Sequence, residues 1–292
     1  MLRKILGAVF LTVLLSAGAT AQTQDDYLDV GVVNVRPEKR AEFDAVTKKM
    51  ADANRRHGGD TWIAMEVIYG EQNAIYLIST RPNYAAMDKG YEAFFGAMNK
   101  AFGQAGTTKL FQDFNNCVVS LRGEVRRRRW DLSANPPADA AAMAKRLGES
   151  RWVRTTIVQV RPGRVLDFEA QLKRVKDALE KGNSNWAPLV SQSSAGQQGT
   201  VFYISWLGSS LGSFDNIPLL SQVLGAEGFK AYMERNADLV QGSETIISHF
   251  LPELSNPPEG VAAAASDFWK PKPAPAKPKA AEAAKPGAAE KK

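Results

Sequence analysis

The sequence has few of the residues that metal sites and nucleophilic catalysis need. Its 292 residues include one cysteine, Cys117, and two histidines, His57 and His249. These three residues are scattered and lack the spacing of zinc or iron ligands, so we expect no metal and no cofactor. A lone cysteine also excludes an intramolecular disulfide, so a chain of this length must be held together by its apolar core.

Membrane spans, phosphate loops and a basic surface are missing as well. No segment approaches the ~20 consecutive apolar residues that a membrane-spanning helix needs. The glycine pairs lack the strand-to-helix context of a phosphate-binding loop. The chain has a net charge of +6, but residues 270–292 alone hold seven Lys and two Glu. The folded remainder is close to neutral, which argues against nucleic acid as a partner.

Residues 1–22 are predicted to be a secretory signal peptide. Basic residues at 3 and 4 precede an apolar stretch over 5–15, and small residues at 19–21 provide a cleavage pattern. The apolar stretch is too short to cross a membrane. We therefore expect an exported protein, periplasmic or extracellular, that is a monomer or a homodimer.

Residues 257–292 are predicted to form a disordered tail. From Lys270 onward the composition is rich in Lys, Pro and Ala and has almost nothing to bury. Such a composition cannot offset the entropy lost on ordering. A solvated spacer is the favoured interpretation, because runs of charge are usually just solvated. Weak contact of the basic tail with an anionic envelope surface is the alternative.

The most informative feature that is present is an internal repeat. Val-Asn-Val-Arg-Pro-Glu and Glu-Phe-Asp-Ala, at 33–38 and 42–45, return 125 positions later as Val-Gln-Val-Arg-Pro-Gly and Asp-Phe-Glu-Ala. A copy at this distance is about one small domain. We therefore divide the folded part into a first repeat over 27–131, a linker over 132–150 and a second repeat over 151–256.

Both repeats are predicted to follow the same order of elements, defined by β-branched runs, helical spacing of apolar residues and turn residues. The first has strands over 30–35, 61–69, 74–79 and 116–125, and helices over 37–57 and 84–102. The second has strands over 153–161, 186–192, 201–207 and 244–251, and a helix over 165–179. Two short helices are expected within 214–239, because Pro218 and two glycines interrupt that segment.

The order strand-helix-strand-strand-helix-strand, read twice, is that of the ferredoxin-like or split βαβ unit. In Val201–Trp206 both alternating sets of side chains contain bulky residues. A sheet that is apolar on both faces needs cover on both faces. We therefore predict an α+β fold of tandem ferredoxin-like repeats, with the two sheets packed face to face as an intramolecular α/β barrel and the helices outside.

This arrangement resembles the dimeric α/β-barrel superfamily, and in particular its NIPSNAP-like and antibiotic-biosynthesis-monooxygenase-like members. The residues that carry the resemblance lie at 158–164, 167–170 and 225–229. It covers about residues 28–252, and its motifs are structural. The superfamily includes cofactor-independent oxygenases, haem-handling enzymes and small-molecule isomerases without a universal catalytic motif. The resemblance therefore implies a barrel, normally made by two chains and here by one, but no residue roles.

The space between the two sheets is the expected site, and strand alternation predicts which side chains face it. If the valines on either side of Asn34 and Gln159 face the helices, these two residues face inward. If Ile63, Met65 and Val67 face the helices, Trp62 and Glu66 face inward. The predicted ligand-binding residues are Asn34, Trp62, Tyr76, Gln159, Trp186 and Tyr203. A slip of one residue would invert each strand's assignment.

Glu66 and His249 are the candidate catalytic residues. A carboxyl group among apolar neighbours in a barrel would have a raised pKa and could act as a general base. A strand-edge glutamate that faces water is the favoured alternative for Glu66, because glutamate is seldom buried. His249 is the only histidine in a predicted strand, and a hydrogen-bonded core or rim imidazole is its favoured alternative.

The run Arg126–Arg129, followed by Trp130, lies where the first repeat gives way to the linker. Such a run could bind an anionic ligand or polymer, with the indole stacking on it. The favoured interpretation is a charge cluster beside the linker that pairs with nearby Asp and Glu.

Three functions are compatible with these observations. The favoured one is an exported barrel protein that binds a small apolar or aromatic molecule between its sheets, because aromatic residues are plentiful and catalytic motifs are scarce. A cofactor-independent monooxygenase- or isomerase-like enzyme is the second. An envelope-associated protein held by its basic tail is the third. Fold resemblance alone does not choose among them.

Overall fold

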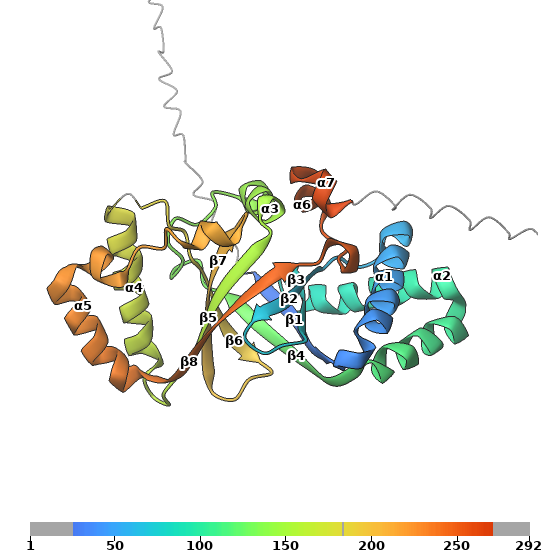
Figure 1. Cartoon of the computed structure of the whole chain (residues 1–292), viewed down its shortest axis with the longest axis horizontal. Coiled ribbons are helices and arrows are strands. Elements are labelled where there is room, and N and C mark those ends of the chain that lie inside the picture. Colours follow the sequence, from blue (N-terminus) through green and yellow to red (C-terminus); the bar gives the residue numbers. More distant parts are fainter. Residues whose placement is uncertain (1–25, 183, 271–292) are drawn as a thin grey trace, which may run out of the picture.

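The structure is a computed structural model that describes residues 26–182 and 184–270. Its centre is a closed barrel of eight strands in the order β1-β3-β2-β8-β5-β7-β6-β4 (Figure 1). Every neighbouring pair is antiparallel. The strands are β1 (Tyr27–Val35), β2 (Ile63–Tyr69), β3 (Ala74–Arg81), β4 (Val118–Arg128), β5 (Trp152–Val160), β6 (Leu189–Ala195), β7 (Thr200–Gly208) and β8 (Val240–Phe250). The predicted α+β fold with a barrel is confirmed.

The barrel joins two four-stranded sheets at their edges. The first sheet has the order β4-β1-β3-β2, and the second has the corresponding order β8-β5-β7-β6. Hydrogen bonding between β2 and β8 and between β4 and β6 closes the circle, with Glu66 opposite His249 at one seam and Arg126 opposite Ser193 at the other. Among the described residues, neither sheet therefore has a free edge strand, which removes the usual template for aggregation.

Helices cover the outside of each half. The first half carries α1 (Arg40–His57) and α2 (Ala85–Asn116), and the second carries α4 (Val165–Lys181) and α5 (Leu220–Leu239). These two pairs lie on opposite sides of the barrel, while α3 (Ala140–Glu149), α6 (Glu259–Ala264) and α7 (Ser266–Trp269) gather at one of its ends (Figure 1). Short 3-10 turns occur at Pro37–Lys39, Leu211–Phe214 and Pro252–Leu254. Among the described residues, no helix is both long enough and apolar enough to cross a membrane.

Helices α2 and α5 differ in length, and this difference shapes the site. Helix α2 was expected to end near residue 102, but it bends at Gly103 (φ 68°) and continues to Asn116. Helix α5 bends at Gly225 (φ 70°) after only five residues, as the predicted interruption suggested. Both glycines adopt the left-handed conformation that other residues avoid. The helical segment before the bend, which we call the first arm, is thus long in α2 and short in α5.

The described interior of the barrel is largely filled with apolar side chains. Val30, Val32, Met65, Tyr76 and Ile246 pack there with residues of the C-terminal segment. Separate clusters lie between the barrel wall and the helices of each half. The barrel therefore has one core inside its wall and one outside it on each flank.

The C-terminal segment closes one end of the barrel, which corrects the expectation of a disordered tail from residue 257. Residues 257–270 include α6 and α7, and the Trp269 side chain is 1 % exposed. The Trp269 indole Nε1 donates to the Gly148 carbonyl oxygen at 2.8 Å. Gly148 belongs to α3, within the predicted linker, and contacts α6 closely. Residues 271–292 and the predicted signal peptide lie outside the described residues.

Candidate functional site

Among the described residues, two cavities are lined by side chains from three or more strands of the barrel. The first, which we call the barrel-mouth cavity, has a volume of about 810 Å³ and lies at the end of the barrel opposite α6 and α7. Polar side chains from several strands and from the β6–β7 turn line it, among them Arg122, Glu124, Arg126, Gln159, Gln197 and Tyr203. The sequence places a carboxylate at its centre and arginines two residues before and after it on the same strand, so all three face the same side of β4.

Glu124 organises this polar group. Its side chain is fully buried, and one carboxylate oxygen accepts from Arg122 and Gln197 while the other accepts from Arg126 and the Tyr203 hydroxyl. The Arg126 guanidinium lies 3.6 Å from the centre of the Tyr203 ring. Burial alone would raise the pKa of Glu124, but Arg126, Tyr203 and Arg122 lower it below its ordinary value. The carboxylate is therefore charged and its hydrogen-bonding capacity is largely used.

Burial raises the pKa of both tyrosines that face this group. The effect on Tyr203 exceeds the opposing attraction of Arg126, and Glu124 adds to it. Burial raises the pKa of Tyr76 against the same opposing attraction of Arg126. Both phenols thus stay protonated near neutrality and can donate hydrogen bonds, but neither is prepared to act as a base.

The second, which we call the helix–sheet cavity, lies outside the barrel wall in the second half. It has a volume of about 360 Å³ between β5, β6 and β7 on one side and α4 and the start of α5 on the other. Aromatic and aliphatic side chains dominate its wall, including Phe168, Leu172, Trp186, Ile204, Trp206 and Val223. Cavities of this size and character are typical of small-molecule sites.

The matching space in the first half is filled. Phe94 lies on the long first arm of α2, 5.7 Å from Trp62 and 6.1 Å from Phe111 between ring centres. Phe114, on the second arm, packs 5.4 Å from Phe43. The short first arm of α5 supplies no such aromatic cluster, since the segment before it is the Ile217-Pro218-Leu219 stretch that lines the cavity. The cavity is therefore a consequence of unequal helix cover.

Arg154 is the charged group that stands out in the helix–sheet cavity. It comes from the outer face of β5, and its guanidinium lies 5.2 Å from the centre of the Trp206 ring. Burial lowers its pKa, and no charged neighbour within the described chain offsets that effect. Lys176, the other cation of the wall, already contacts Glu180 and the Asp131 carbonyl oxygen.

The structure separates the predicted ligand-binding residues. Tyr76, Gln159 and Tyr203 line the barrel-mouth cavity, as strand alternation suggested. Asn34 lies at the end of β1, where its amide donates to Glu71 and Ser120. Trp186 lines the helix–sheet cavity, on the other side of the barrel wall. Their roles in binding stay predictions.

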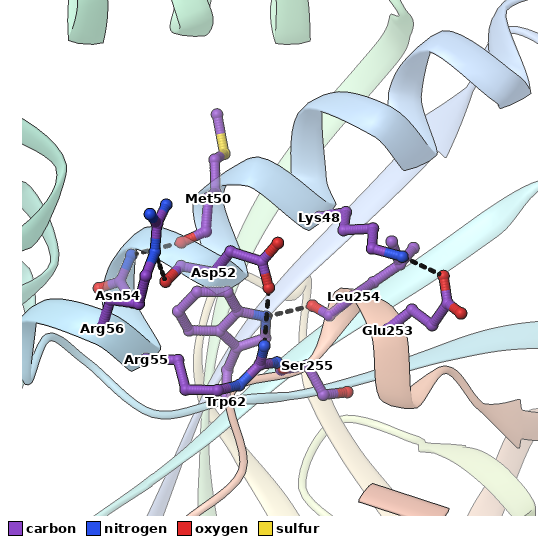
Figure 2. Close-up of polar contacts among 10 residues, drawn as sticks. All are labelled: Lys48, Met50, Asp52, Asn54, Arg55, Arg56, Trp62, Glu253, Leu254 and Ser255. Carbon is purple, nitrogen blue, oxygen red and sulfur yellow. Dashed lines mark hydrogen bonds and ion pairs between the residues drawn. The ribbon is translucent and has the colours of Figure 1, made fainter. Parts of the chain in front are cut away.

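The side chains of β2 point to the faces opposite to those predicted. Ile63, Met65 and Val67 face the barrel interior, while Trp62 packs under α1 and α2. Figure 2 shows the Trp62 indole close to α1, where its Nε1 donates to the Leu254 carbonyl oxygen at 2.8 Å. Both alternating sets of β2 are apolar, so the sequence could not tell which face was which.

Glu66 and His249 lie opposite each other in the β2–β8 pair, on the outer face of the wall. Glu66 is held by both terminal nitrogens of Arg40 from α1. The His249 ring lies 4.5 Å from that of Trp152, and burial lowers its pKa against the opposing effect of Glu66. Neither residue lines either of the two cavities. Their catalytic role stays a prediction without an adjacent cavity to support it.

Most of the arginine run lies in strand β4 and not beside the linker, which corrects the predicted position. Arg126 and Arg128 are buried side chains of β4 rather than part of a linker surface. Arg129, just after the strand, pairs with Asp131 and with Glu169 of α4. Pairing with nearby acids was the favoured interpretation, and Arg126 and Arg129 do form such ion pairs. A signal was available, because Glu124, Arg126 and Arg128 alternate as an inward-facing strand would.

Sequence reasoning also passed over a Gly-x-Ser-x-Gly pattern at Gly208–Gly212. Ser210 has an extended backbone (φ −150°) and caps the 3-10 turn Leu211–Phe214, where its hydroxyl lies 3.4 Å from that of Ser213. A nucleophile elbow would instead be strained and open to a base. Within residues 26–182 and 184–270, no group of His, Cys, Asp and Glu side chains could hold a metal ion.

Comparisons with known proteins give matches only among solved structures, at low sequence identity. No family model matches the sequence, and no curated protein is similar to it. Among solved structures, a candidate monooxygenase of Lactobacillus acidophilus is 11 % identical, with a TM-score of 0.45 over 77 % of this chain and 94 % of that one. An anthrone oxidase-like protein is 12 % identical, with a TM-score of 0.46 over 80 % and 93 %. Chlorite dismutase from Candidatus Nitrospira defluvii is 10 % identical, with a TM-score of 0.44 over 82 % and 94 %.

Proposed function

We propose that this protein binds a small organic molecule, mainly apolar or aromatic, in the helix–sheet cavity. The observation that carries the proposal is the apolar cavity of about 360 Å³ under α4 and α5, beside a first half in which aromatic side chains fill the same space. An unfilled apolar cavity costs stability, because its lining forgoes dispersion contacts. A ligand of matching shape restores those contacts.

The cavity replaces the space between the sheets as the site for an apolar ligand. The barrel interior holds its own apolar core, and α6 and α7 seal one end of it. What is left open at the other end is polar, with Glu124 and two arginines at its centre. An apolar molecule would have to displace water from these charges without replacing their hydrogen bonds. The outer cavity has the better chemistry for such a ligand.

The cavity also favours binding over catalysis. Its wall offers Thr156, Tyr232, Asn236 and Ser243 as uncharged polar groups. Burial raises the pKa of Tyr232, so this phenol is a hydrogen-bond donor rather than a base. The candidate catalytic pair lies at the β2–β8 seam instead. We therefore assign the cavity a binding role.

Titration with a neutral polarity-sensitive dye, N-phenylnaphthylamine, tests the proposal. We expect saturable fluorescence enhancement with one dye per chain. Val223→Trp would place an indole in the cavity and weaken dye binding by at least tenfold. Val119→Trp is the matched control, because Val119 is 64 % exposed and lies on β4, away from the cavity. Absence of saturable binding, or equal binding by Val223→Trp, would refute the proposal.

We also propose that the two halves are tandem copies of one ferredoxin-like unit and that the chain is exported. The matching strand orders and the repeat at 125 positions support the first proposal. The basic start, short apolar stretch and small residues of 1–22 support the second. N-terminal sequencing of protein secreted from its host tests export: a mature chain that lacks the predicted signal peptide is expected, and an intact Met1 terminus in the cytoplasm would contradict it.

A further inference from the structure

We infer that the ligand of the helix–sheet cavity is a monocarboxylic acid with an apolar or aromatic body, whose carboxylate pairs with Arg154. The inference rests on the proposed function, because it names the chemical class of ligand for the same cavity. It starts from a cation without a counter-charge in a mainly apolar wall.

The Arg154 side chain makes no hydrogen bond or ion pair with any described residue, and its guanidinium lies over the Trp206 ring. A guanidinium has five N–H donors, and the edge of its plane stays available when one face lies over an aromatic ring. Arg154 is partly buried, so water can satisfy those donors only in part, and a ligand carboxylate would pair with the rest. The geometry therefore presents an unused, charged donor to whatever occupies the cavity.

The first half shows what a satisfied version of this position looks like. Asp29 on β1 corresponds to Arg154 on β5, since each is paired across to the third strand of its half, at Ser79 and at Trp206. Asp29 lies 3.6 Å from the Arg81 guanidinium, which also holds Asp60. The charge at this position is thus balanced by the protein in the first half and left unbalanced in the second.

The rest of the cavity wall adds to the imbalance. None of the described residues that line it is an aspartate or a glutamate, and Lys176 is its other charged member. Lys176 is engaged by Glu180 at 3.9 Å, so one full positive charge remains. A single charge matches a monoanion better than a phosphate dianion, which would need further donors. The planar fork of a guanidinium matches the two oxygens of a carboxylate.

The arrangement gives each part of the ligand a partner. Trp186, Trp206 and the aliphatic side chains of α4 would contact the apolar body, and Arg154 would fix the acid end at the barrel wall. Two charge-assisted hydrogen bonds to a carboxylate are directional, so they also set the orientation of the ligand. A neutral amide of the same shape keeps the apolar contacts but loses the ion pair.

Displacement of N-phenylnaphthylamine by naphthaleneacetic acid and by naphthaleneacetamide tests the inference at neutral pH. In the unmodified protein, the inhibition constant for displacement of the dye should be at least tenfold lower for the acid than for the amide. Arg154→Gln should weaken acid binding on the order of tenfold to a hundredfold, in line with a hydrogen-bonded charge pair, and affect amide binding much less, so that the preference for the acid over the amide is lost. Arg154→Lys, which keeps the charge but not the fork, should fall between.

Arg164→Gln is the matched control, because Arg164 pairs with Asp167 on the surface and does not line the cavity. Equal displacement by acid and amide in the unmodified protein would overturn the inference, whatever the variants do. An acid preference that survives Arg154→Gln would overturn it as well. In both cases dye binding that is still sensitive to Val223→Trp leaves the proposed function intact, whereas loss of dye binding itself removes the proposed function.

Discussion

Replacing Trp269 by alanine should destabilise the whole barrel rather than loosen its last helix. Trp269 is 1 % exposed, packs 5.6 Å from the Phe250 ring and donates to the Gly148 carbonyl oxygen. Burial of roughly 150–250 Å² at about 25 cal/mol per Å² gives an upper bound of ~4–6 kcal/mol. Buried Trp→Ala changes cost about 3–5 kcal/mol. We expect a loss of that size in the free energy of unfolding.

Urea unfolding followed by far-UV circular dichroism measures this loss without relying on tryptophan fluorescence. The melting temperature should fall by roughly 6–20 °C, at about 2–4 °C per kcal/mol for a chain of this size. Trp269→Phe keeps most of the ring and loses the hydrogen bond to Gly148, so it should cost only about 1–2 kcal/mol. A loss below about 1 kcal/mol for Trp269→Ala would show that α7 does not close the barrel and would refute the reasoning.

Three further predictions concern the polar centre, the α3–α6 contact and the candidate catalytic pair. Glu124→Ala leaves two arginines without their carboxylate and should cost about 3–5 kcal/mol in urea unfolding. The pKa of Glu124 is lower in the folded state than in the unfolded state, so the charged carboxylate stabilises the fold at pH values above the unfolded pKa. This stabilisation is lost as the pH falls through the folded pKa. In a pH series, the free energy of unfolding of Glu124→Ala should therefore fall less steeply with acid than that of the unmodified protein. Gly148→Ala would place Cβ 2.4 Å from a backbone oxygen of α6 and should lower the melting temperature, while Gly96→Ala, with nothing within 4 Å, should not. Glu66→Gln and His249→Ala should leave dye affinity unchanged, and a tenfold change in either would place the site at the β2–β8 seam instead.

Local patterns predicted the elements well, because each depends on residues that are close in the chain. The spacing that includes Phe43 and Met50 describes the buried face of α1, and the spacing that includes Phe168 and Leu172 describes that of α4. The matching runs that begin the two repeats became β1 and β5, which hold the same place in the two strand orders. The continuation of α2 past Gly103 was missed because glycine is an ordinary stop signal.

Side-chain direction was harder to predict when both faces of a strand are apolar. Tyr203 faces the barrel-mouth cavity and Phe202 packs on Phe168 of α4, although both alternating sets of their strand contain bulky residues. Trp62 and Met65 both have buried sites, one under α1 and the other inside the barrel, so alternation alone could not order them. The pairing of Glu66 with Arg40 joins two elements whose angle the sequence does not encode locally.

By itself, the sequence determined the order of the eight strands and of the four helices that cover them, and the α+β barrel, because hydrophobic periodicity and turn residues act over a few positions. Only the tertiary structure decided which faces became interior, that the segment up to Trp269 closes one end, and that Arg154 was left without an acid beside a cavity. Those outcomes depend on how helices of different length, α2 and α5, cover two sheets with the same strand order. Such packing is a property of contacts between residues far apart in the chain.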